Sequence, residues 1–291
     1  MLRSPCPTSP SGFARTVPMI DREEEVLRPL DVDDMPAAFQ LSSQAGWNQT
    51  EDDWRTLLDL APKTCFGIEI QGRLASTITL ICYGRRLGWI GMVLTRTEFQ
   101  GRGLARKLLQ HTLHLADKMG METLKLDATD QGQQLYLQSG FRGEHPIERW
   151  SRHDGRTAQF PSGPFPRRAW AERDLKYFGA DRLPLLERLA QRNSLLLRNR
   201  AYLLARPGRV CAYLGPCVSD NPEDARSLIS TCLEEKLGSW SWDLFPGNHN
   251  ALSIARDLGF TPQRHLLRMA RGKELAQNID ATYAIAGFEL G

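Results

Sequence analysis

The sequence predicts an α/β fold of the α+β kind, in which mixed, mostly antiparallel sheets are flanked by helices and the whole unit occurs in two tandem copies. Three observations lead to this prediction. Strand-like and helix-like segments follow one another in a definite order over residues 20–152. A glycine-rich turn at residues 100–105 joins a strand to a helix, and the second half of the chain faintly repeats the first.

The first copy opens with a strand, two helices and three strands. EVLRPLDVDDMPAAFQLSSQAG (25–46) predicts a strand and then a helix that begins at the cluster Asp31, Asp33 and Asp34. GWNQTEDDWRTLLDL (46–60) predicts a second short helix capped near Thr50. KTCFGIEIQ (63–71), RLASTITLICYG (73–84) and LGWIGMVLT (87–95) predict three antiparallel strands, separated by turns at Gly72 and at residues 84–86.

The remainder of this copy alternates helices with strands. In the helix that follows residue 103, one face is mostly apolar and consists of Leu104, Leu108, Leu109, Thr112, Leu115 and Ala116. METLKLDAT (121–129) predicts a strand, DQGQQLYLQSGF (130–141) a helix that ends at Gly140, and HPIERWSR (145–152) another strand. The resulting order of elements is β-αα-βββ-α-β-α-β.

The turn QGRGLA, residues 100–105, is a candidate anion site. Free N–H groups and the positive end of the helix dipole favour an anion at a helix N-terminus, and glycines let a phosphate approach the backbone. The spacing fits neither the G-x-G-x-x-G dinucleotide fingerprint nor the P-loop, which needs Lys-Ser or Lys-Thr after its last glycine. An ordinary tight turn before a helix remains the alternative.

The same turn resembles the Q/R-x-x-G-x-G/A motif of the GCN5-related N-acetyltransferase (GNAT) superfamily. Gln100, Gly103 and Ala105 occupy the motif positions, with Gly101, Arg102 and Leu104 between them. The element order also resembles that family's fold over roughly residues 24–152. The resemblance implies that the loop binds the pyrophosphate of acetyl-CoA. It further implies that a splay between the strands at 92–95 and 124–128 takes the pantetheine arm, to which Val93, Leu94 and Thr95 offer backbone groups.

A second segment resembles the closing motif of that family. Thr129, Gly132, Tyr136, Gly140 and Phe141 occupy its places. The resemblance implies that Thr129 contacts the cofactor and that Tyr136 is the general acid. Chemically, coenzyme A leaves as a thiolate whose thiol has a pKa of roughly 8.5, and a nearby phenol can donate the proton. A half-buried core tyrosine is the alternative interpretation.

The acceptor site and the proton acceptor are less well defined by sequence. Trp47 and Asn48 lie between the first two helices, where the family builds its acceptor pocket, and an aromatic ring beside amides suits a small polar amine. A tryptophan that packs a helix corner is the alternative interpretation of Trp47. Asp127 is predicted as the catalytic carboxylate because it lies nearest the expected splay, with Glu98, Glu69 and His111 as further candidates. The resemblance implies neither a metal nor a covalent intermediate.

The second copy is predicted to be degenerate. NHNALSIARDLGF (248–260) aligns with TDQGQQLYLQSGF (129–141), so that Ala255 takes the place of Tyr136. Upstream, Val218 matches Thr95, so the second copy lacks about four residues between the two aligned segments. The natural place for this deletion is the turn, where DNPEDARSLI contains no glycine and has acids at the helix start. This half is similar to the second domain of tandem bacterial acetyltransferases of the YitH-like kind.

The domain boundaries follow from composition. Residues 1–19 are predicted to form a disordered leader rich in Pro and Ser, 20–152 the catalytic domain, 153–170 a linker and 171–291 the degenerate GNAT-like domain. Six cysteines without a CxxC pair predict reduced thiols and a cytoplasmic location. A net charge of +3 and the lack of any transmembrane-length apolar run argue against nucleic-acid and membrane partners.

The predicted function is acetyl transfer from acetyl-CoA to a primary amine of a small molecule, by a monomer or homodimer. Two alternatives stay open at this point. The acceptor can be a protein or peptide amine, or the chain can be a non-catalytic acetyl-CoA-binding protein that mediates interactions.

Overall fold

The computed structural model describes residues 24–153, 167–235 and 238–291. The leader predicted at 1–19 and most of the linker predicted at 153–170 therefore lie outside the described residues. The last part of that linker span is helical, because α5 already begins at Arg167.

The elements of the first half follow the predicted order. They are β1 (Glu25–Pro29), α1 (Met35–Gln44), α2 (Glu51–Leu60), β2 (Cys65–Ile70), β3 (Arg73–Tyr83), β4 (Leu87–Thr95), α3 (Leu104–Lys118), β5 (Thr123–Ala128), α4 (Asp130–Leu137) and β6 (Arg142–Arg152). The predicted start signals are confirmed, since Asp31 and Asp34 form a capping box before α1, and Thr50 and Asp53 form one at α2. Short 3-10 turns at Val32–Asp34 and Thr97–Phe99 complete this half.

The described residues of the second half repeat this order from the two helices onward. Its elements are α5 (Arg167–Phe178), α6 (Leu183–Arg192), β7 (Ser194–Arg198), β8 (Ala201–Arg206), β9 (Ala212–Val218), α7 (Pro222–Glu235), β10 (Trp240–Leu244), α8 (His249–Asp257), β11 (Thr261–Gly272) and β12 (Thr282–Ala284). The aligned helices α4 and α8 also begin in the same way. The Thr129 hydroxyl accepts from the Gly132 N–H, and the Asn248 amide oxygen accepts from the Ala251 N–H. The repeat is therefore structural as well as sequential.

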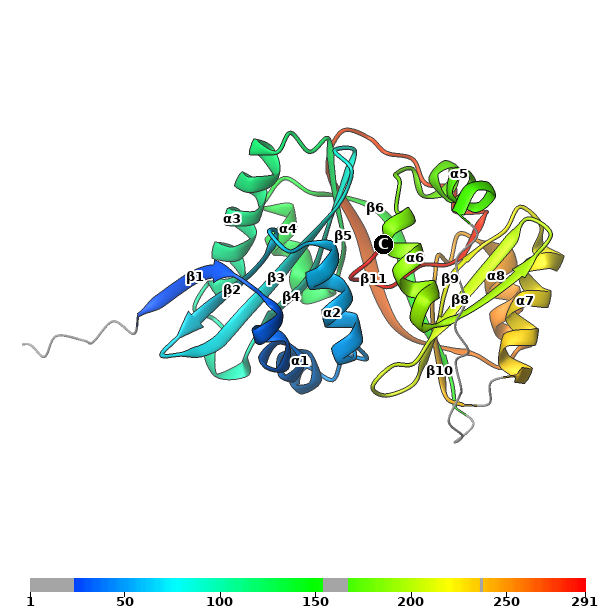
Figure 1. Cartoon of the computed structure of the whole chain (residues 1–291), viewed down its shortest axis with the longest axis horizontal. Helices are drawn as coiled ribbons and strands as arrows, with labels where there is room; N and C mark the ends of the chain where they lie inside the picture. The colour runs from blue at the N-terminus through cyan, green and yellow to red at the C-terminus, as the bar shows by residue number, and fades with distance from the viewer. Residues whose placement is uncertain (1–23, 154–166, 236–237) are drawn as a thin grey trace, which may run out of the picture.

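The strands of the described residues form one continuous 12-stranded sheet, in which β6 of the first half and β11 of the second are exchanged. The order is β1-β2-β3-β4-β5-β11-β6-β10-β9-β8-β7, with β12 beside β9. Thus β11, from the second half, pairs with β5 of the first, while β6 crosses to pair with β10 (Figure 1). The sequence did not indicate this exchange, and the sheet is continuous across the boundary predicted at residue 152.

One arginine–aspartate pair joins each exchanged strand to the neighbouring strand of the other half. Arg268 on β11 lies opposite Asp127 on β5 and donates two hydrogen bonds of 2.8 and 2.9 Å to its carboxylate. Arg149 on β6 lies opposite Asp243 on β10 and donates two of 2.7 and 2.6 Å. The two arginines are 119 positions apart, the same offset that relates α4 to α8.

Helices cover the sheet in three groups. One cluster packs α3 and α4 on the first half's strands, and a second packs α7 and α8 on the strands of the second half (Figure 1). The largest cluster combines α1 and α2 with α5 and α6, so the two halves share one core. Burying apolar side chains from both halves in one core couples their stability.

Residues 285–291 lie between the two halves (Figure 1). The Trp89 indole donates to the Phe288 carbonyl at 2.9 Å, the Tyr83 hydroxyl to the Leu290 carbonyl at 2.6 Å, and Arg182 to the Gly291 carbonyl at 2.9 Å. Gly91 is required here, because a Cβ at that position would lie 2.9 Å from the Glu289 Cα. No helix within the described ranges is both long and apolar enough to cross a membrane.

Replacing Arg268 with methionine should destabilise the protein by about 3–5 kcal/mol, because Asp127 would keep a buried charge without its partner. The matched control is Arg271→Met on the same strand, whose pair with Asp117 is exposed and should contribute under about 1 kcal/mol. Urea unfolding of both variants measures the difference. Equal destabilisation would show that the Arg268–Asp127 pair does not hold the exchanged strand.

Candidate active site

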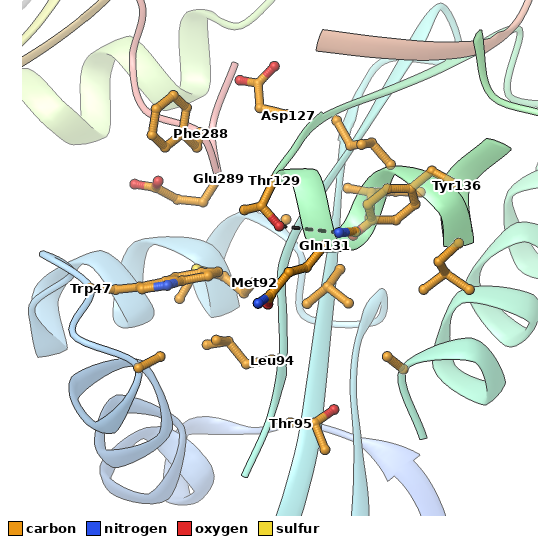
Figure 2. Close-up of a pocket in the computed structure, with 18 of the residues that line it drawn as sticks. Trp47, Met92, Leu94, Thr95, Asp127, Thr129, Gln131, Tyr136, Phe288 and Glu289 are labelled. Carbon is orange, nitrogen blue, oxygen red and sulfur yellow. Dashed lines mark hydrogen bonds between the residues drawn. The ribbon is translucent and has the colours of Figure 1, made fainter. Parts of the chain in front are cut away.

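A cavity of about 730 Å³ opens where β4 and β5 diverge, and both halves of the chain line it (Figure 2). The first half contributes β4, the glycine turn, the start of α3, the end of β5 and α4. The exchanged strands contribute Arg149, Arg264 and Leu266, and the segment 285–291 contributes Phe288 and Glu289. The cavity is therefore a product of the whole chain.

The predicted splay between β4 and β5 is present. These parallel strands pair only from Leu87 to Trp89 on β4, although β4 continues to Thr95. Met92 adopts a φ of 48°, and the β3–β4 register shifts beside it, so a bulge bends β4 where the two strands part. Val93, Leu94 and Thr95 consequently line the cavity on a strand edge that β5 does not cover.

The glycine turn leaves open space in front of a helix N-terminus. Gly101 and Gly103 have φ values of 77° and 79°, a left-handed conformation that suits glycine. Apart from their chain neighbours, no heavy atom lies within 4 Å of where a Cβ would sit at either position. No acidic residue occupies the first turn of α3, and no side chain caps it. Its N–H groups and dipole are thus available to an anion such as a diphosphate.

The other residues of the turn have separate contacts. Gln100 also lines the cavity and donates from its side-chain amide to the Thr95 carbonyl at 3.2 Å, which ties the turn to β4. Leu104 and Ala105 begin α3 and line the cavity as well. Arg102 lies outside the lining, with its guanidinium 5.5 Å from the centre of the Phe99 ring and 3.8 Å from Glu25.

The second half has lost this turn, as predicted. Residues 96–103 connect β4 to α3, whereas only 219–221 connect β9 to α7. The first turn of α7 carries Glu223 and Asp224, and the Asn221 side chain accepts from the Glu223 N–H at 2.8 Å. That helix N-terminus is already occupied by acceptors and by negative charge, so it is unfavourable for a phosphate.

Tyr136 lines the cavity from α4 and is buried. Its ring meets Phe141 edge to face, with the ring centres 6.0 Å apart. Within the described chain no group exchanges a hydrogen bond with the Tyr136 hydroxyl. Burial raises the pKa of this phenol well above its ordinary value, so the hydroxyl holds its proton at neutral pH.

The small residue in the predicted motif is explained by the Tyr136 ring. A Cβ on Gly132 would lie 3.0 Å from the ring carbon Cε2 of Tyr136, so position 132 has little room for a side chain. In the second half both positions differ together, since Ala251 replaces the glycine and Ala255 replaces the tyrosine. An alanine at 251 is tolerated there because the facing side chain is also small.

The geometry argues against Asp127 as the catalytic carboxylate. Its side chain is 0% exposed, and both of its oxygens accept from Arg268. Burial raises the pKa of this carboxyl and Arg268 opposes the rise, so Asp127 serves as the anchor of β11. The other three candidates do not line the cavity: Glu98 pairs with Arg73, Glu69 pairs with Arg28, and His111 lies edge-on to the Phe66 ring.

The two residues predicted to bind the acceptor differ in their position relative to the cavity. Trp47 lines the cavity, whereas Asn48 does not. The Asn48 amide oxygen accepts from the N–H groups of Val210 and Cys211 at 2.8 and 3.0 Å, and its nitrogen donates to the Cys211 carbonyl at 2.9 Å. All of its polar atoms are thus used to join the two halves, which corrects its prediction as a substrate-binding residue.

Sequence reasoning missed Glu289, the carboxylate at the Trp47 end of the cavity (Figure 2). Its side chain is 3% exposed, and its oxygens accept from Gln49 at 3.0 Å and from Arg206 at 3.3 Å. Burial raises the pKa of the Glu289 carboxyl. In the sequence, Glu289 is an acidic residue within the apolar run YAIAGFEL, and nothing in the neighbouring residues indicates that it reaches the cavity.

Family models match both halves of the chain. A model of the acetyltransferase (GNAT) family matches residues 28–141, and a model of an acetyltransferase (GNAT) domain matches residues 171–284. The chain belongs to the GNAT family. The predicted tandem arrangement is therefore confirmed, and the protein is an acyltransferase of a family that uses acetyl-CoA.

Relatives of this GNAT protein share its length and arrangement. The uncharacterized N-acetyltransferase YitH of Bacillus subtilis (strain 168) is 26% identical over 250 residues, which cover 80% of this chain and 86% of YitH. A candidate acetyltransferase from Pyrococcus horikoshii has a similar fold, with a TM-score of 0.81 at 21% identity, covering 92% of this chain and 96% of that one. A tandem GNAT protein from the clavulanic acid biosynthesis pathway aligns with a TM-score of 0.57 at 16% identity, covering 86% and 100%.

The residues around the turn of this GNAT protein fit the family's co-substrate. An open glycine pair, a helix start free of acids and an uncovered strand edge follow one another along the cavity. In the part of the chain that the structure describes, no group of three or more His, Cys, Asp or Glu side chains could hold a metal ion.

Replacing Asn48 distinguishes a structural bridge from a substrate contact. Asn48→Ala should lower the free energy of unfolding by about 1–3 kcal/mol, because the Val210 and Cys211 N–H groups lose their acceptor. Asn48→Asp keeps the acceptor and loses only the donor, so its loss should be smaller. Chemical denaturation measures both. Normal stability combined with a raised KM for the amine would restore Asn48 to the acceptor site.

Proposed function

We propose that this GNAT protein transfers an acetyl group from acetyl-CoA to a primary amine of a small molecule, with Tyr136 as the general acid. The observation that carries the proposal is a single cavity that reaches from the glycine turn past Tyr136 to Glu289 and Trp47. A site that favours phosphates, a buried proton donor and a buried carboxylate are thereby joined in one space.

The cofactor end of the cavity is assigned to the first half. The turn Gln100 to Ala105, including Arg102, would hold the pyrophosphate at the start of α3. The edge of β4 at Val93, Leu94 and Thr95 would pair with the pantetheine amides, and Thr129 would lie beside them at the start of α4. Support comes from the open φ-positive glycines and the early end of the β4–β5 ladder.

Two side chains would move protons in the reaction. Acetyl-CoA, when bound, supplies an acetyl thioester whose carbonyl carbon gains a C–N bond to the amine as its C–S bond breaks. The Tyr136 hydroxyl donates its proton to the departing sulfur, and its raised pKa supports that role because the acid must be protonated beforehand. The Glu289 carboxylate accepts the proton that the amine nitrogen loses, and its raised pKa makes it a stronger base.

The construction of the acceptor end favours a small molecule over a protein lysine. Arg209 of the second half donates to the Trp47 carbonyl at 2.9 Å, and Gln49 is bound to Glu289. The loop that carries Trp47 and Gln49 is therefore held in place by hydrogen bonds to the second half. A protein acceptor needs an open groove, whereas this end is bordered by residues of both halves.

Gly103→Glu should weaken acetyl-CoA binding by about 100-fold or more, because a carboxylate would take the space and the dipole meant for the pyrophosphate. Gly259→Glu is the matched control, since Gly259 has the same φ of 79° and equally open surroundings but lies after α8. Calorimetric titration should give one site per chain in the wild type and in the control. Two equivalent sites, or unchanged affinity in Gly103→Glu, would contradict the assignment.

Tyr136→Phe removes only the hydroxyl and should lower kcat by roughly 100-fold, the usual scale for a lost general acid. Affinity for acetyl-CoA should stay within about twofold of the wild type in the same titration. Because burial raises the pKa of the phenol, the wild-type rate should show no loss from its ionisation up to about pH 10.

An internal control uses the second half. Ala255→Tyr combined with Ala251→Gly restores the tyrosine and its small neighbour where no glycine turn exists, and should add no activity. Near-normal turnover of Tyr136→Phe with weakened binding would instead make Tyr136 a packing residue.

A further inference from the structure

Arg264 on β11 lies in the cavity wall and forms no ion pair with another residue of the described chain. It is half-buried, and no carboxylate or carbonyl of residues 24–153, 167–235 or 238–291 accepts a hydrogen bond from its guanidinium. The other buried arginines around this cavity are paired: Arg149 with Asp243, Arg206 with Asp53 and Glu289, and Arg268 with Asp127. A half-buried unpaired cation is costly, so this one calls for an explanation.

The position of Arg264 in the sheet makes the free-energy cost of burying its charge greater. In the ladder between β11 and β6 it lies directly opposite Arg149, just after a register shift at residues 262–264. Like charges placed directly across a ladder destabilise a sheet. Burial and the charge of Arg149 both lower the pKa of Arg264, and Asp243 and Asp130 attract it only from a distance.

Asp243 relieves this repulsion only in part, because it is paired with Arg149. Its carboxylate is 0% exposed, receives both hydrogen bonds from Arg149 and a third from the Tyr213 hydroxyl at 3.1 Å. The Arg149 guanidinium also lies over the Phe288 ring, 4.6 Å from its centre. Arg149 is thus held in place by Asp243, whereas no carboxylate of the described residues lies within ion-pair distance of Arg264.

A second group of charged side chains adjoins the same cavity. Arg206 bridges two carboxylates, those of Asp53 and Glu289, at 3.2 and 3.3 Å. One positive charge shared by two acids leaves this cluster negative. The wall of the cavity therefore includes a positive group at Arg264 and a negative group at Glu289.

The geometry points to an acceptor that carries a carboxylate close to its amine, as in an amino acid, with the carboxylate bound by Arg264 and the amine facing Glu289. This inference rests on the proposed acetyl transfer and specifies its acceptor. A guanidinium binds a carboxylate through two parallel N–H···O bonds. Bound substrate would thus remove the charge imbalance that the free protein carries.

The test uses matched amines that differ only in the carboxylate: L-tyrosine and tyramine, L-lysine and cadaverine, L-phenylalanine and phenethylamine. The wild type should prefer the member with a carboxylate in each accepted pair, by about 10- to 100-fold in kcat/KM. Arg264→Gln should abolish the preference while acetyl-CoA affinity is unchanged. A drop in acetyl-CoA affinity in that variant, or a wild-type preference for the decarboxylated amines, would overturn the inference.

Stability of the free protein separates binding from a structural role. Arg264→Gln removes a repulsion, so its thermal midpoint should equal or exceed that of the wild type. Arg149→Gln is the matched control across the ladder, and it should unfold at a lower temperature because it leaves Asp243 buried without a partner. A destabilised Arg264→Gln protein would mean that the arginine serves the fold.

Thermal shifts with the same amines distinguish failure of this inference from failure of the proposed function. Stabilisation by carboxylate-bearing amines that is lost in Arg264→Gln supports the inference even without acetyl transfer. Turnover of the carboxylate-bearing amines that is equal in wild type and Arg264→Gln would keep the acetyltransferase and refute the inference. The absence of both stabilisation and turnover with every carboxylate-bearing amine would also refute the inference.

Discussion

The buried pairs Arg268–Asp127 and Arg149–Asp243 are the constraint on which the rest of this structure depends. The first pair joins β11 to the sheet of the first half, and the second joins β6 to the sheet of the second half. Neither aspartate has any exposed side-chain surface. A buried ion pair gives little net stability, but removing one partner is costly, so each pair specifies which strand lies beside which. The exchange of β6 and β11 then makes the two halves one sheet.

This exchange decides where the active site obtains its residues. Without it, β11 would not lie beside β5, and Arg264 and Leu266 would not line a cavity that opens at the end of that strand. The segment 285–291 depends on the same arrangement, because it lies between the halves and presents Glu289 beside β4. In the described part of the second half, an acidic turn replaces the glycine turn and Ala255 stands in the place of Tyr136, yet this half contributes charged residues to the cavity of the first.

The charges of the cavity support the proposal that one end binds the cofactor and the other binds the acceptor. Neutral glycines and free N–H groups form the cofactor end, where a helix dipole suffices to favour a phosphate. Paired and unpaired arginines with a raised-pKa carboxylate form the acceptor end. Such charges are expensive to bury, and natural proteins tolerate such costs mainly where function needs them. We propose that the degenerate copy serves as part of the acceptor site.

The sequence by itself determined the order of elements, the capping boxes at Asp31 and Thr50, the glycine turn, the tyrosine on α4 and the loss of both features in the second copy. These depend on local spacing and conformational preference, which a single segment records. Only the tertiary structure decided that Asp127 anchors β11, that Asn48 joins the two halves and that Glu289 and Arg264 reach the cavity. The partners of these residues are 141, 163 and 240 positions away or face them across an exchanged strand, and no local pattern carries information about contacts that long-range pairing creates.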